Sequence, residues 1–200
     1  MSDSCNTKPT ARQLFGKITR LLTSLKDTSE LMTDLAYSSL LLNSQELAEE
    51  VQRSGKYFDE LHMEFERLVL SSGFKPDEAN DFLGLLRLGM ITGKIADAAS
   101  EIAEVVLHGL EPHHVLKLVI DEAEETVVRV EVSKGSKLVG KKLKEAKIYQ
   151  ETGMRTLAIR RGTWWIRPRP ETVIRSGDFL ISSGYAEGEE DLRKLASGSS

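Results

Sequence analysis

The chain has 200 residues, of which 40 % are hydrophobic and 29 % charged, and its net charge is -4. This composition fits a globular protein with one ordinary domain or two small ones, and it excludes a largely disordered chain. No run approaches the roughly 18 consecutive apolar residues of a membrane-spanning helix, so we expect no direct membrane insertion. The single cysteine, Cys5, rules out an internal disulfide and favours a reducing, cytoplasmic location.

The first half of the chain has the periodicity of long amphipathic helices. Apolar residues recur at steps of four and three over 14–35, and again over 47–68. Ser44 is the expected N-cap of the second helix, which ends at Gly73. Pro76 then opens a third helix. Helices of roughly 30 residues are about 45 Å long, and short connections make them antiparallel neighbours.

The third helix carries two apolar seams, which predicts neighbours on two sides. We expect a long antiparallel helical bundle over 10–111, a bridging helix over 112–125 and a disordered leader over 1–9. One seam consists mostly of small residues, and the other of larger ones: Leu86, Gly89, Gly93, Ala96, Ser100, Ala103 and Leu107, against Leu85, Leu88, Thr92, Ile95, Ala99, Ile102 and Val106.

From Thr126 the pattern changes to short strands and short helices. The stretch 126–132 alternates like a strand, 136–147 has the pattern of an amphipathic helix, and 154–168 indicates a hairpin. A last strand follows the turn at Ser176-Gly177-Asp178, with Phe179 and Ile181 on the expected core face, and a closing helix ends the unit. The resulting β-α-β-β-β-α unit over 126–195 gives the whole chain an α+β fold class. This unit is basic, with 13 Lys/Arg against 5 Asp/Glu over 126–185.

The order of these pieces resembles the TrkA C-terminal domain, also called RCK_C, of regulators that gate potassium and other cation transporters. The residues that carry the resemblance are "VEVSKGSKLVGKKLKEAKIYQETGMRTLAIRRG" and "IRPRPETVIRSGDFLISSG". The helical half resembles a single PhoU-type bundle through "DLAYSSLLLNSQELAEEV" and "ITGKIADAASEIAEVVL". A lone repeat, where PhoU proteins typically carry two, implies a homodimer. The pairing of the two domains is similar to archaeal proteins related to potassium channels.

The RCK_C resemblance implies a groove that binds cyclic di-AMP at a dimer interface. A cyclic dinucleotide is therefore one candidate ligand, although the sequence leaves the cofactor unnamed. The chain departs from the nucleotide-binding pattern at Tyr149, where such families have an arginine. The alternative is that Ile148 and Leu143 belong to the core and that Arg155 is a solvated strand-end residue. Carried over by position, the groove residues are Leu143, Ile148, Tyr149, Arg155, Thr156 and Pro170.

The PhoU resemblance raises a metal site made of carboxylates four residues apart. Asp97 matches the family aspartate, but Gly93 stands where an acid is expected. Asp97 with Glu101, and Glu30 with Asp34, keep the spacing. Solvated helix faces produce the same pattern, so we expect no metal ion.

Other classes of function have weaker sequence signals. Arginines near Trp164 and Trp165 superficially resemble a single-strand stacking platform. Adjacent strand residues point to opposite faces, so one tryptophan is expected in the core and nucleic-acid binding is not expected. Catalytic triads, P-loops, G-x-G-x-x-G and C-x-x-C motifs are absent, so we expect neither an enzyme nor NAD binding. His113 and His114 are interpreted as helix-entry residues.

The sequence thus predicts a cytoplasmic, homodimeric regulatory subunit of a cation channel or transporter, with potassium as the expected ion. It would sense a small ligand through its RCK_C domain and reach the membrane only through its partner. The alternative is a PhoU-like metal-binding regulator of phosphate or divalent-ion uptake, in which the C-terminal domain only dimerises.

Overall fold

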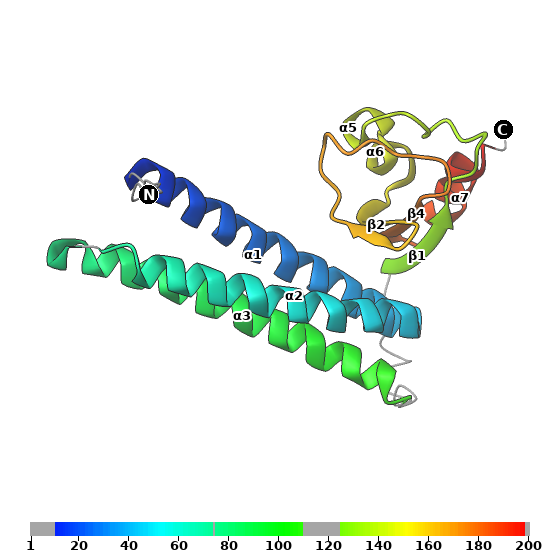
Figure 1. The fold of residues 1–200 in the computed structure, drawn as a ribbon. Helices are drawn as coiled ribbons and strands as arrows, with labels where there is room; N and C mark the ends of the chain where they lie inside the picture. The colour runs from blue at the N-terminus through cyan, green and yellow to red at the C-terminus, as the bar shows by residue number, and fades with distance from the viewer. Residues whose placement is uncertain (1–10, 74, 110–124, 199–200) are drawn as a thin grey trace, which may run out of the picture.

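Three long antiparallel helices form the N-terminal half of the protein (Figure 1). The computed structural model describes residues 11–73, 75–109 and 125–198. Helix α1 spans Ala11–Leu41, α2 spans Gln45–Leu70 and α3 spans Ala79–Leu107. The leader over 1–9 and most of the expected bridging helix, with His113 and His114, lie outside the described residues.

Local chemistry sets the ends of these helices as the sequence predicts. The Ser44 hydroxyl accepts the backbone N–H of Leu47 at 3.4 Å, which confirms it as the N-cap of α2. Gly73 has a φ of +68° just beyond α2. Pro76 opens a single 3₁₀ turn, η1 (Pro76–Glu78), and the α-helix itself starts three residues later than the sequence predicts.

The small-residue seam of α3 lets the other helices approach closely. A Cβ atom on Gly89 would lie 2.6 Å from the Phe65 ring of α2, so only glycine fits there. Ala96 and Ala103 are buried in the same seam. The second seam is buried only in part, because Leu88 and Ile95 remain about half exposed. Helix α3 nevertheless packs against both α1 and α2, so it has the neighbours on two sides that its seams predict.

The C-terminal half is a small antiparallel sheet with short helices, which confirms the α+β fold class. Its strand order is β1-β4-β2-β3, and helix α7 closes the unit. Val130 of β1 and Ile159 of β2 both pair with Leu180 of β4. The strands and helices are β1 (Glu125–Glu131), α5 (Leu143–Ala146), α6 (Ile148–Thr152), β2 (Arg155–Arg161), β3 (Trp164–Ile166), β4 (Phe179–Tyr185) and α7 (Gly188–Ser197).

The prediction of one continuous helix over 136–147 is wrong. Turns lead to α5, and Lys147, in a left-handed conformation with a φ of +50°, separates α5 from α6. Two local features prevent a single helix: the Ser136 hydroxyl accepts the Leu138 N–H at 3.1 Å, and Gly140 has a φ of +82°. Leu138 and Ala146 are nevertheless buried, as the amphipathic pattern indicates.

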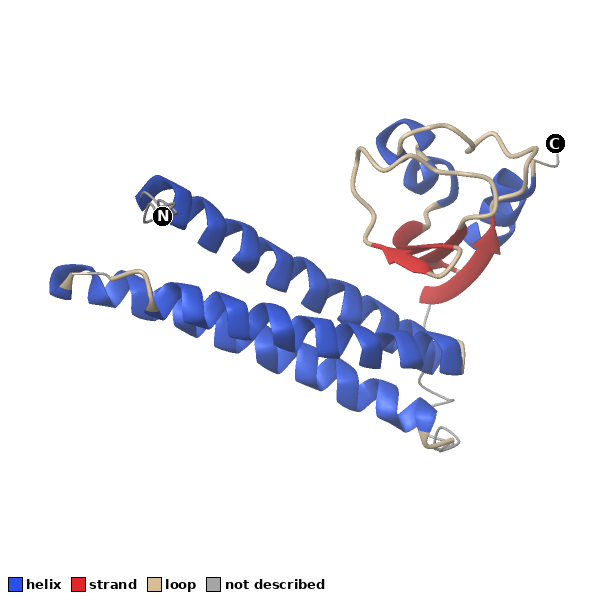
Figure 2. Ribbon diagram, viewed as in Figure 1, coloured by secondary structure: helices blue, strands red, loops and turns tan. Residues whose placement is uncertain are grey.

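The sheet is packed on both faces, and this corrects the expected core face of β4. One face carries Val128, Ile159 and Leu180 into the domain's own core, under α6 and α7. The other face carries Ala158 and Ile181 into the hydrophobic core of the helical bundle. Figure 2 shows the strands between the bundle and the short helices α5 and α6. Ile181 is therefore a domain-contact residue, and the domain core lies on the Leu180 side.

The two tryptophans point to opposite faces, as expected for neighbours on a strand. Trp165 packs against the bundle core, whereas Trp164 is 76 % exposed. The predicted boundary of the bridging helix also changes, because Glu125 is already the first residue of β1.

Candidate ligand groove and its junction with the bundle

All six residues predicted from the sequence line one groove on the C-terminal domain. This outer groove has a volume of about 300 Å³ and lies between α5, α6, the start of β2 and the loop after β3. The structure therefore brings together positions that are up to 27 residues apart in the sequence. Its complete lining is Leu143, Lys144, Ile148, Tyr149, Gln150, Met154, Arg155, Thr156, Pro168, Arg169 and Pro170.

The floor and rim of the outer groove differ in polarity. Ile148 is only 4 % exposed and belongs to the domain core, so it contributes an apolar floor rather than a free side chain. Leu143 is partly buried against the same core. Tyr149 is 64 % exposed at the rim. Ile148 and Leu143 thus pack in the domain core, as the alternative predicts, and they also line the groove.

Backbone hydrogen bonds fix the walls of the groove. The Lys144 N–H donates to the Pro170 carbonyl at 3.1 Å, which ties α5 to the loop after β3. Gly153 adopts a φ of +70°, and its N–H donates to the Tyr149 carbonyl at 2.8 Å. This left-handed residue ends α6 and turns the chain into β2, so that Arg155 begins the strand at the groove.

A second hollow, the inter-domain cleft, adjoins the outer groove. It has a volume of about 360 Å³ and is bounded by α1, α3 and the C-terminal domain. Arg155, Thr156 and Pro168 line both hollows, so the two are continuous at these residues. Sequence reasoning missed the cleft, because no local pattern links α1 to β2. Its other lining residues are Lys26, Ser29, Glu30, Thr33, Asp34, Thr92, Ile95, Leu157 and Arg167.

Asp34 is the acidic group that faces Arg155 across the inter-domain cleft. Burial raises the pKa of the Asp34 carboxyl above its ordinary value of 3.8, and the Arg155 charge opposes that rise. Within the described part of the chain, Arg155 makes no ion pair as close as 4 Å, so its guanidinium remains available to an anion. An exposed arginine is a suitable partner for a phosphate.

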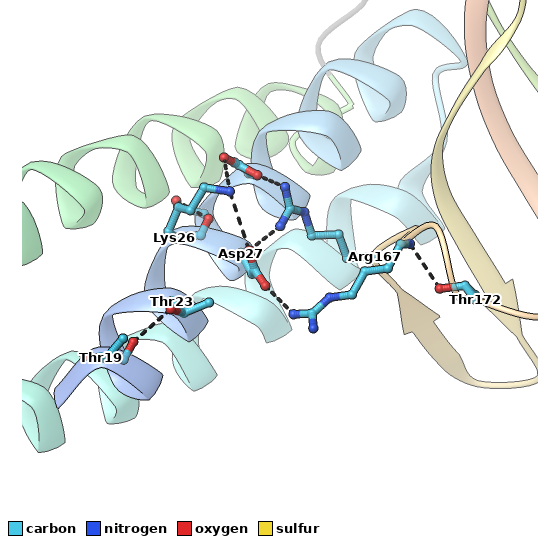
Figure 3. Close-up of polar contacts among 9 residues, drawn as sticks. Thr19, Thr23, Lys26, Asp27, Arg167 and Thr172 are labelled. Atoms are coloured by element: carbon cyan, nitrogen blue, oxygen red, sulfur yellow. Dashed lines mark hydrogen bonds and ion pairs between the residues drawn. The ribbon is translucent and has the colours of Figure 1, made fainter. Parts of the chain in front are cut away.

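An arginine–carboxylate cluster joins the loop after β3 to α1 (Figure 3). Asp27 accepts from both Arg167 and Arg169, and Glu30 accepts from Arg167. Lys26 approaches the Glu30 carboxylate at 2.8 Å. These arginines lie on the same loop as the prolines of the outer groove, so the loop that bounds the groove is held to the bundle by charge.

A second ionic contact lies at the other edge of the domain interface. Glu46 of α2 accepts from Arg129 at 3.1 Å and also contacts Arg160. The Arg129 guanidinium also lies 4.4 Å from the centre of the Phe179 ring. The bundle and the sheet are therefore joined by ionic groups on either side of an apolar contact.

The carboxylates raised as metal ligands do not converge. Asp97 and Glu101 are exposed on α3, and Glu30 is engaged by Arg167 and Lys26. Among the residues that the structure describes, no group of three or more His, Cys, Asp or Glu side chains is arranged to hold a metal ion. The carboxylate pair of Asp97 and Glu101 therefore has no third His, Cys, Asp or Glu ligand arranged beside it among the described residues.

Comparison with protein families confirms both resemblances drawn from the sequence. Residues 127–197 match the TrkA-C domain, and residues 22–106 match the PhoU domain. The chain is thus similar to a PhoU domain in its helical half and to a TrkA-C domain in its C-terminal half. None of the described helices is both long and apolar enough to cross a bilayer.

The chain is also similar to a curated archaeal protein, potassium channel protein 1 of Methanocaldococcus jannaschii. The two are 33 % identical over 99 residues, which is 49 % of this chain and 29 % of the channel protein. This chain therefore matches less than a third of that relative's length.

Solved structures similar to the chain include RCK_C domains. The RCK_C dimer of S. agalactiae BusR in complex with c-di-AMP is 26 % identical, with a TM-score of 0.33, and covers 34 % of this chain and 92 % of its own. The RCK C domain of the potassium transport protein KtrA, also with c-di-AMP, is 26 % identical with a TM-score of 0.34, and covers 40 % and 93 %. BusR with its promoter DNA is 15 % identical with a TM-score of 0.33, and covers 64 % and 84 %.

Proposed function

We propose that this protein is a homodimeric regulatory subunit of a cation channel or transporter, with potassium as the transported ion. Its TrkA-C domain would bind a cyclic dinucleotide in the outer groove. The observation that carries the proposal is that the six residues implied by the RCK_C resemblance line one groove, with Arg155 free of any described ion pair. The similarity to an archaeal potassium channel protein supports potassium over phosphate.

The chemistry of the outer groove fits half of such a ligand. Arg155 offers a planar guanidinium to a phosphate, and the apolar surface around Leu143 and Ile148 suits the edge of a base. A volume of about 300 Å³ is at the lower limit of pockets for drug-sized ligands. A cyclic dinucleotide carries two phosphates and two bases, so it would be shared between the grooves of two copies.

Regulation would follow from linkage between the ligand and the arrangement of the two domains. Arg155 lines both the outer groove and the inter-domain cleft, where Asp34 faces it. A phosphate bound at Arg155 would compete with the favourable charge interaction from Asp34. The ligand then changes the domain arrangement only by its difference in affinity for the two arrangements.

The direct test is calorimetric titration of the full chain with cyclic di-AMP. We expect saturable binding at one ligand per two chains, and a loss of about tenfold or more in affinity in Arg155→Ala, since a charged contact is worth more than about 1.4 kcal/mol. Arg193→Ala on α7, whose exposed side chain pairs only with Glu189, is the matched control. Absence of binding to the wild-type chain, or equal affinity in both variants, would reject the proposal.

The alternative, a metal-binding regulator of phosphate or divalent-ion uptake, rests on the PhoU domain match. It predicts that the purified protein binds a metal ion and that Asp97→Ala removes it. Metal analysis of wild type and variant decides this alternative independently of the nucleotide titration.

A further inference from the structure

A largely exposed apolar seam with heptad spacing runs along α3. Its residues step by four and three over three heptads, and it is distinct from the small-residue seam buried in the bundle. Leu88 and Ile91 are each 52 % exposed, and Ile95 is 45 % exposed. The complete seam is Gly84, Leu88, Ile91, Ile95, Ala98, Ile102 and Val105.

Such an apolar stripe on an exposed helix marks an interaction surface. A strict 3.5-residue repeat is the pattern by which one helix packs knobs-into-holes against another. On one side the seam joins a groove of about 380 Å³ between α1 and α3, to which Ile18 and Leu22 contribute. The surface therefore fits a helix that lies along α3.

We infer that this seam binds α3 of a second copy of the chain in antiparallel orientation. From residue 84 to residue 102, the steps between successive seam residues are four, three, four, three and four. The order is the same in both directions, and the centre of the pattern is position 93. An antiparallel copy would therefore place seam residue against seam residue along this whole stretch. The inference deepens the homodimer of the proposed function by assigning its contact on the bundle, and it does not depend on the ligand.

The sizes of the seam residues match this orientation. Antiparallel pairing places Leu88 opposite Ala98 of the second copy, and Gly84 opposite Ile102. Each large residue thus meets a small one, while Ile91 meets Ile95. Parallel pairing would instead place glycine against glycine and alanine against alanine, which leaves gaps in the interface.

The charges beside the seam favour the same orientation. Its amino-terminal half is flanked by exposed Arg87, its centre by exposed Lys94, and its carboxyl-terminal half by exposed Asp97, Glu101 and Glu104. An antiparallel copy brings the basic half of one α3 against the acidic half of the other, whereas a parallel copy opposes like charges. Among the described residues, Arg87 and Glu101 form no ion pair within the chain. A second copy would supply their partners through an isologous interface.

Oxidative cross-linking of the full chain in a Cys5→Ser background tests the interface and its orientation. The double variant Leu88→Cys/Ala98→Cys should form a covalent dimer, because the two positions face each other across the antiparallel seam. Leu88→Cys alone and Ala98→Cys alone should not cross-link above Glu60→Cys, an exposed position on α2. Efficient cross-linking by Leu88→Cys alone would indicate a parallel pair, and no cross-linking by the double variant would overturn the inference.

Two additions make the test quantitative. Ile91→Glu in the double-cysteine background should lower the cross-linking yield at limiting protein concentration by about tenfold, since it buries a charge in the seam. Arg87→Glu and Glu101→Arg should each lower the yield, and their combination should restore it, because the pair is rebuilt with reversed sign. Failure of the combination to restore the yield would reject the proposed charge pairing. Cyclic di-AMP titration of the same variants reports separately on the proposed function.

Discussion

Arg161 and Asp178 form a bidentate ion pair in which Nε and Nη2 of the guanidinium each donate to one carboxylate oxygen at 2.8 Å. The Asp178 side chain is only 1 % exposed and also accepts the Arg175 N–H at 2.8 Å. Arg161 donates further to the Val173 carbonyl. The pair thus ties the end of β2 to the turn before β4, and so fixes the carboxyl-terminal end of the loop that bounds the outer groove.

Replacing Asp178 by Ala should destabilise the protein by about 3 kcal/mol, because it removes a fully buried carboxylate and leaves the partly exposed Arg161 guanidinium and the Arg175 backbone N–H without their acceptor. Urea denaturation of the full chain at neutral pH measures this change. Arg193→Ala is the control, since its ion pair with Glu189 is exposed on α7 and should contribute less than about 1 kcal/mol. Equal destabilisation by the two substitutions would show that the Arg161–Asp178 pair contributes no more to stability than an exposed ion pair.

Gly188 at the start of α7 should not tolerate a methyl group. A Cβ atom there would lie 1.9 Å from the Thr152 carbonyl oxygen of α6, so Gly188→Ala must displace backbone. We expect a destabilisation of about 1–3 kcal/mol in thermal or urea unfolding.

The matched glycine is Gly16 in α1, where an added Cβ meets nothing within 4 Å. Gly16→Ala should raise stability by about 0.5–1 kcal/mol, because alanine loses less backbone entropy in a helix. If Gly188→Ala were as stable as Gly16→Ala, the close packing of α6 against α7 would be wrong.

The contact between the domains should depend on salt. Asp27 is the shared acceptor of Arg167 and Arg169, and its side chain is only 16 % exposed. Asp27→Asn keeps the shape of the side chain but removes its charge, so it should raise hydrogen exchange in β3 and in the loop that follows. The difference from wild type should shrink in about 0.5 M salt, where the Debye length is only a few ångströms.

Glu64→Gln is the control for this measurement, because Glu64 pairs with Lys17 within the bundle and away from the interface. It should leave exchange in β3 unchanged. Unaltered exchange in Asp27→Asn would mean that the apolar contact of Ala158 and Ile181 holds the domains together without help from the charges.

Local sequence patterns predicted most helices and strands, but they did not predict contacts between residues that are distant in the sequence. The caps and seams of α1 and α2 could be read because each depends on residues within a few positions, as Ser44 and Leu47 illustrate. The single helix over 136–147 was wrong because Gly140 and Lys147 adopt left-handed conformations that an amphipathic pattern does not reveal. Ile181 was assigned to the domain core because alternation marks an apolar face without naming what covers it.

The same distinction applies to the groove. Arg155 and its neighbours in the outer groove were found by resemblance, since they belong to one continuous module. Asp34 entered the sequence analysis only as half of a carboxylate pair with Glu30. In the structure the two carboxylates have different partners, because Glu30 pairs with Arg167 and Asp34 faces Arg155. No periodicity links α1 to β2, so the inter-domain cleft could be seen only in three dimensions.

Asp34→Asn should stabilise the protein at pH 7 but not in acid. Burial raises the folded-state pKa of Asp34 above its ordinary value of 3.8, so the folded chain holds this proton more tightly than the unfolded chain. Ionisation of Asp34 therefore costs stability at any pH above the folded pKa, and this cost disappears as the pH falls through that value towards 3.8. Asparagine cannot ionise and so avoids this cost. Tm should therefore rise by a few degrees at pH 7, and the difference from wild type should vanish near pH 4.

The control is Asp97→Asn, which replaces an exposed carboxylate on α3 and should leave Tm unchanged at both pH values. A constant difference between Asp34→Asn and wild type across this range would mean that packing, rather than the Asp34 charge, causes the effect.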